Sequence, residues 1–157
     1  MGCSGSKPAA KAVQTVPLQP GESVILPTKQ LQRVFIGLGW NNAASGQTVD
    51  LDCSINAYNN DGTRDDANTV YFGHLRNNAH AKRKTGSSIV HTGDVLKGKQ
   101  EGDDATSGGD MERIYVWLDA LPEHIATIAF AADVFTKGVS FASLSNAYVR
   151  LVNADTK

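Results

Sequence analysis

The sequence predicts an all-β protein, an antiparallel β-sandwich with one or two short helical turns. Two runs carry most of this prediction. Residues Val49–Tyr58 alternate strictly between apolar and polar side chains, as expected for a strand with one buried and one solvated face. Residues His124–Val134 are nearly all apolar, which predicts a central strand buried on both faces. Further short apolar runs, separated by turn residues, follow the spacing typical of a sandwich.

The other elements are predicted from shorter patterns. Glu22–Leu26 is a candidate first strand. Gln32–Trp40 is a second, and it places Val34, Ile36 and Leu38 on one face. Weaker or later strands are expected at Thr69–Phe72, Ser88–His91, Arg113–Leu118 and Ala147–Asn153, with a helical turn within Phe141–Asn146.

The chain has 157 residues, which suits one domain with a sizeable core. Residues 1–16 are small and polar and are predicted to form a flexible arm, whereas residues 17–157 form the folded domain. No apolar run approaches the roughly 18 residues needed to span a bilayer. The sequence also lacks the apolar segment of a signal peptide, so we expect a cytoplasmic location.

Charge is distributed unevenly along the chain. The formal net charge of -1 argues against nucleic acid as a partner, for which a basic face is expected. Eleven of the 16 acidic residues fall in two windows, five within residues 50–66 and six within residues 94–112. Folded acidic loops of this kind usually need a cation nearby.

Asp50 and Asp52 form the first candidate cation site. Residues two apart on a strand share a face, with α-carbons roughly 6.5–7 Å apart. Two carboxylates at that separation repel each other unless a positive charge lies between them, and calcium prefers six to eight oxygen ligands. The alternative is a solvated strand face. Cys53, which alternates with apolar residues, is expected to be a small core residue.

The second acidic window favours the cation site. Asp94 follows a predicted strand, and the glycine-containing loop of residues 97–104 supplies Asp103 and Asp104. Glycines let backbone carbonyls turn inward as additional ligands. The alternative reading of this segment is a mobile acidic surface loop.

Several motifs occur in a characteristic order: Gly37-Leu-Gly-Trp40, Val49-Asp-Leu-Asp-Cys-Ser54, Ile89-Val-His-Thr-Gly-Asp94, Glu101-Gly-Asp-Asp104 and Phe141–Arg150. In this order and spacing the chain resembles the TerD domain family over roughly residues 18–154. The resemblance implies a β-sandwich in proteins linked to tellurite resistance and stress responses, with no established enzymatic activity. It also implies calcium binding through conserved acidic positions, which correspond here to Asp50, Asp52, Asp94, Asp103 and Asp104.

The chain departs from the family pattern around this site. Asn41 stands where the family usually has Asp, and Val95 replaces a usual Asn. Lys97 and Lys99 lie in a loop that is usually very acidic. Calcium affinity follows the charge of the ligands, so we expect at least one site weaker than is usual for the family, or empty. Asn41, Asn42 and loop carbonyls are expected to complete the ligand shell, and Glu112 corresponds to the acidic residue that usually follows the Asp pair.

The N-terminus carries a lipidation pattern. Gly2, with Ser at position six, fits N-myristoylation, and Cys3 is well placed for palmitoylation. One acyl chain binds a membrane only marginally, so the second chain would make the attachment stable. This pattern predicts a lipid-anchored, peripheral membrane protein in a eukaryotic host. The alternative is an ordinary start rich in small residues.

We therefore expect a non-enzymatic calcium-binding module at the cytoplasmic face of a membrane. One alternative is a binder of small ligands such as cyclic nucleotides, but Gly37-Leu-Gly-Trp40 is expected on a strand, not at the helix start that cradles a phosphate. A further alternative is a metal-dependent hydrolase with His91 as the base beside a bound ion. No nucleophile motif supports it.

Overall fold

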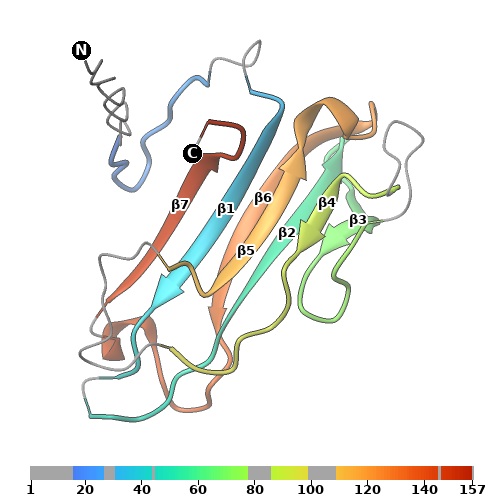
Figure 1. Ribbon diagram of the computed structural model, residues 1–157. Coiled ribbons are helices and arrows are strands. Elements are labelled where there is room, and N and C mark those ends of the chain that lie inside the picture. The colour runs from blue at the N-terminus through green and yellow to red at the C-terminus, as the bar shows by residue number, and fades with distance from the viewer. Residues whose placement is uncertain are drawn as a thin grey trace, which may run out of the picture.

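The computed structural model describes residues 16–26, 31–43, 45–77, 86–98, 109–144 and 146–156. Gly2, Cys3, Asp103 and Asp104 lie outside these ranges. Within them, two antiparallel sheets form a β-sandwich with two short 3-10 turns, which confirms the predicted fold class (Figure 1). In the part of the chain that the structure describes, no helix has the length and apolar character to cross a membrane.

The first sheet has four strands in the order β4-β5-β1-β7, and the second has three in the order β3-β2-β6 (Figure 1). The elements are β1 Arg33–Trp40, β2 Leu51–Asn59, β3 Arg64–Val70, β4 Ile89–His91, β5 Glu112–Trp117, β6 Ile125–Val134 and β7 Ala147–Asn153, with 3-10 turns η3 Leu118–Ala120 and η4 Phe141–Ser143.

The core lies between the two sheets. Val34, Ile36 and Leu38 of β1 are buried, as predicted. On β2 the buried residues alternate strictly with partly exposed ones, and Cys53 is buried at 2% exposure. The alternation holds because β2 is the middle strand of a sheet whose other face is open to solvent. The structure therefore puts Asp52 on the outer face, one residue from the core.

The prediction for His124–Val134 was wrong in one respect. The run forms β6, but β6 is the edge strand of the three-stranded sheet, and none of its residues is fully buried. Ile128, Phe130 and Val134 pack against the core, whereas its other face carries mostly small side chains such as Ala129 and Ala131. Alanine is apolar enough to mimic a buried face in the sequence yet small enough to remain exposed.

Three other boundaries differ from the prediction. Residues 22–26 are not a strand, and Ile25 is 98% exposed. The strand expected at Thr69–Phe72 begins and ends earlier, as β3, because Tyr71 exchanges backbone hydrogen bonds with His74 in a turn. Leu118 ends the expected strand at Arg113–Leu118 by entering η3.

The glycines of β1 make room for side chains on the outer face of the four-stranded sheet. A β-carbon on Gly37 would lie 2.4 Å from Cγ of Asp110, and one on Gly39 would lie 2.4 Å from the Tyr148 ring. These side chains therefore pack directly onto the β1 backbone. Gly37-Leu-Gly-Trp40 does sit on a strand, as expected, and the space above both glycines is filled by the protein itself.

Candidate metal centre

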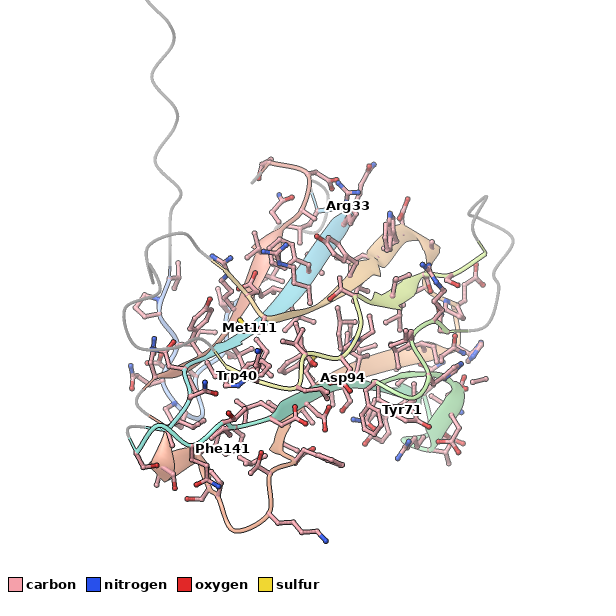
Figure 2. The ribbon with its side chains drawn as sticks, turned by 60° about the horizontal axis from the view of Figure 1, so that its bottom comes forward. Arg33, Trp40, Tyr71, Asp94, Met111 and Phe141 are labelled. Carbon is pink, nitrogen blue, oxygen red and sulfur yellow. The ribbon has the colours of Figure 1, made fainter. Side chains whose placement is uncertain are left out.

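Three carboxylates of the predicted site come together. Asp50, Asp52 and Asp94 each offer an oxygen atom, and these oxygens lie within 4.8 Å of one another. Asp50 and Asp52 flank Leu51 at the start of β2, in the three-stranded sheet, whereas Asp94 follows β4, in the four-stranded sheet. Figure 2 shows Asp94 in its segment beside β2. The acidic cluster, as we call these three residues, thus bridges the two sheets.

The backbone fixes both sides of the acidic cluster. The start of β2 is held by Trp40, whose buried indole nitrogen donates to the Val49 carbonyl at 2.8 Å. The amide of Asp50 donates to Oγ1 of Thr136 at 2.9 Å. On the other side, Gly93 adopts a φ of 115°, a conformation that strongly favours glycine, and it turns the chain between β4 and Asp94.

The acidic cluster is not neutralised by an ion pair among the described residues. Within that part of the chain, no lysine or arginine forms an ion pair with any of the three carboxylates. Burial raises the pKa of Asp50, and the charges of Asp94 and Glu112 raise it further. Burial, followed by the charges of Asp50, Glu112 and Asp94, raises the pKa of Asp52 to about 6. Proximity to His91 only partly offsets this.

One atom of the cluster is left without a partner. Among the described residues, Oδ1 of Asp50 is buried and accepts no hydrogen bond. A buried carboxylate oxygen without a donor is costly, and a bound cation would remove that cost. The donor set, three carboxylates from two segments, fits a hard cation such as calcium, which takes oxygen ligands.

Glu112 lies outside the acidic cluster, in a buried layer beneath it. Its side chain is fully buried, and both of its oxygens have protein partners. Oε1 accepts from the amide of Val95 at 3.0 Å, and Oε2 accepts from the amide of Cys53 at 3.1 Å. Glu112 therefore ties β5 to β2 and to the segment after Asp94. It acts on the acidic cluster through its charge and by holding these two segments.

Cys53, His91 and Glu112 form a second group with ligand-like spacing, which was not predicted from the sequence. Nε2 of His91 lies 3.4 Å from both Oε2 of Glu112 and Sγ of Cys53. Nδ1 accepts a hydrogen bond from the amide of Gly93 at 3.0 Å, so in the neutral ring Nε2 carries the proton. A protonated Nε2 does not ligate a metal. Nε2 of His91 points to Glu112 inside the protein, and both side chains are buried, so His91 is poorly placed to act as the base of a hydrolase.

Of the two asparagines predicted as ligands, Asn42 binds backbone amides through its side chain. Oδ1 of Asn42 accepts from the amides of Val49 and Gly98, at 3.1 and 3.0 Å. The backbone amide of Asn41 donates to the carbonyl of Asn146 at 2.9 Å. Asn42 therefore shapes the loop that leads into Asp50. Asp103 and Asp104 lie outside the described residues.

The fold and the site together define the class of protein. It is an antiparallel β-sandwich protein with acidic side chains gathered where its two sheets meet. The chain belongs to the TerD family: the TerD domain matches residues 15–157. It is 31% identical over 150 residues to the tellurium resistance protein TerD of Serratia marcescens, covering 91% of this chain and 71% of the relative. It is 33% identical over 149 residues to general stress protein 16U of Bacillus subtilis, covering 90% and 70% respectively.

Solved structures share the fold. A crystal structure of a homologue of telluride resistance protein (TerD), SCO6318 from Streptomyces coelicolor A3(2), superposes with a TM-score of 0.54 at 21% identity. The superposition covers 79% of this chain and 67% of that one. A protein of unknown function, SAV2460, gives a TM-score of 0.56 at 18% identity, covering 80% and 68%.

Proposed function

We propose that this chain is a calcium-binding TerD module that acts without catalysis in a stress response. The observation that carries the proposal is the acidic cluster of Asp50, Asp52 and Asp94, with its unpaired buried oxygen on Asp50. A calcium ion bound there would neutralise the mutual repulsion of these carboxylates and give that oxygen a partner. The role in stress is inferred from the relatives, which are named for tellurium resistance and for general stress.

The site is expected to be weaker than a highly charged calcium site. Three carboxylates supply only part of the six to eight oxygens that calcium takes, so backbone carbonyls, water and residues such as Asp103 and Asp104 would supply the rest. Asn42 is committed to backbone amides, and Val95 offers no side-chain oxygen.

Calorimetric titration of the full chain with calcium tests the proposal. We expect chelator-reversible heat that is lost when Asp50 and Asp52 are replaced together by asparagine. Asp66→Asn is the matched control, because Asp66 is 86% exposed and forms an ion pair with Arg64 on β3. Absence of binding at millimolar calcium, or equal binding by the double variant, would overturn the proposal.

We also propose that acylation at Gly2 and Cys3 attaches the chain to the cytoplasmic face of a membrane. The support is the sequence pattern itself, since one acyl chain binds marginally and two bind stably. Intact mass of the protein purified from its native host measures the added groups directly. Gly2→Ala should remove both the myristoyl mass and membrane co-sedimentation. Unmodified mass in the native host would refute the anchor while leaving the calcium proposal standing.

A further inference from the structure

A pocket of about 230 Å³ opens beside the acidic cluster on the outer face of the three-stranded sheet. Its walls include three aromatic side chains, Tyr71, Phe72 and Phe135, and two carboxylates, Asp52 and Asp133. Drug-sized ligands occupy pockets of roughly 300–1,000 Å³, so this one suits a single head group.

The three rings form a compact exposed group. Tyr71 and Phe72 follow β3, and Phe135 follows β6, so the rings approach from both sides of β2. Ring centroids lie 5.5 Å apart for Tyr71 and Phe72, at 87°, and 6.2 Å apart for Phe72 and Phe135, at 65°. The near-perpendicular rings present faces in more than one direction. Their exposed fractions are 40%, 44% and 65% for Tyr71, Phe72 and Phe135.

Backbone hydrogen bonds fix the chain segments that carry the rings. The amide of Phe135 donates to the carbonyl of Asp50 at 3.0 Å. Tyr71 and His74 donate to each other's carbonyls at 3.1 and 2.9 Å, which closes the turn that carries Tyr71 and Phe72. The backbone positions that carry the rings are therefore fixed next to Asp50 and within the turn after β3. Figure 2 shows Tyr71 on the same side of the molecule as Asp94.

The pocket is negatively charged as well as aromatic. Asp52 and Asp133 are direct partners in the register of β2 and β6, so their side chains share the outer face. Like charges opposite each other on neighbouring strands destabilise a sheet. Within the described residues, no hydrogen bond or ion pair of the Asp133 side chain offsets this repulsion.

Aromatic faces and carboxylates together select one ligand chemistry. The negative face of an aromatic ring attracts an organic cation, and aromatic cages recognise quaternary ammonium groups in this way. An anion would be repelled by both aspartates, and a neutral apolar ligand would desolvate them without compensation. We propose that the pocket of Tyr71, Phe72, Phe135, Asp52 and Asp133 binds an alkylated ammonium group, such as the head group of a choline compound.

Choline is the probe, titrated into the isotope-labelled full chain and followed by NMR, with a chelator present so that the result does not depend on calcium. We expect saturable shifts at the amides around Tyr71, Phe72, Phe135 and Asp133. The neutral isostere 3,3-dimethyl-1-butanol, which has carbon in place of the charged nitrogen, should bind at least about fivefold more weakly. Equal binding of the two probes would overturn the proposal, as would the absence of saturable shifts.

Variants distinguish choline binding in the pocket from non-specific binding to exposed apolar surface. Phe72→Leu and Phe135→Leu retain apolar bulk but lose the aromatic face, and Asp133→Asn removes charge from an exposed position. Each should weaken choline binding about fivefold while the spectrum of the folded protein is retained. Phe141→Leu is the control, because Phe141 is 48% exposed in η4 and lies apart from Tyr71 in Figure 2. Unchanged choline affinity in both the Phe72 and the Phe135 variants would refute the assignment.

Discussion

The carboxylate of Asp110 receives two hydrogen bonds from the guanidinium of Arg150, from Nε to Oδ1 at 2.7 Å and from Nη2 to Oδ2 at 2.8 Å. Nε of Arg113 donates to the same Oδ2 at 2.9 Å. Arg150 belongs to β7 and Arg113 to β5, the two strands that flank β1. Asp110 therefore joins three strands of one sheet, and its side chain is fully buried.

Asp110→Ala should destabilise the fold. The substitution leaves two guanidinium groups without their shared acceptor, but both are partly exposed, at 36% and 40%, so water replaces some of the lost bonds. We expect a loss of about 2 kcal/mol, measured by urea unfolding. Asp155→Asn is the control, because its pair with Arg33 is exposed on both sides and should contribute below about 1 kcal/mol. Equal losses in the two variants would contradict this account.

Gly37→Ala should destabilise the protein through the same carboxylate. The new β-carbon would displace Asp110, whose Cγ lies only 2.4 Å from that position. We expect a loss of about 1–3 kcal/mol in the parent chain and a smaller loss in an Asp110→Ala background, where the clash is gone. A double-mutant cycle by urea unfolding measures the difference. Strictly additive losses would show that the clash is not the cause.

Stability without calcium should depend on the ionisation of Asp52. Its pKa is raised from 3.8 to about 6 in the folded chain, so between these values the folded state binds more protons than the unfolded state. The loss of folding stability that comes from ionising Asp52 is therefore absent below pH 4. It develops as the pH rises through 6 and is fully present at pH 7. In a chelator, thermal stability should increase from pH 7 to pH 5 by more in the parent than in Asp52→Asn. Identical profiles would contradict the shifted pKa.

Glu112→Gln should weaken both the fold and the site. The carboxylate accepts from two buried backbone amides, and an amide side chain would turn an NH₂ donor toward one of them. We expect a loss of about 1–3 kcal/mol in urea unfolding, with weaker calcium binding as the Asp94 segment shifts. Glu123→Gln, at an exposed position, is the control and should change neither. Parent-like stability of the Glu112 variant would refute this role.

The sequence predicted the fold wherever the pattern of burial was simple. Strict alternation located β2, because one face is buried and the other is not. The sequence pattern misplaced β6 in the sheet, because the alanines on the outer face of β6 are apolar without being buried. The strand expected at Glu22–Leu26 is absent because residue type alone does not provide a partner strand.

The candidate site was predicted in part. Spacing along one strand put Asp50 and Asp52 together, since that relationship is local. The place of Asp94 beside them depends on how two sheets pack, and it came from the family resemblance. The buried layer of Cys53, His91 and Glu112 had one usable signal, since the polar residues His91 and Glu112 stand at inward positions of two strands. No pattern in the sequence indicated that Asp110 packs against Gly37.

A change in the length of β2 would affect both of its faces at once. Asp50 and Asp52 alternate with Leu51 and Cys53, so deleting one residue within the strand would bring carboxylates into the core and core residues into water. Substitutions can adjust either face alone, but a single-residue insertion or deletion would remove both the fold's central strand and its candidate metal site in one step. Length variation among related chains should therefore be confined to the loops on either side of β2.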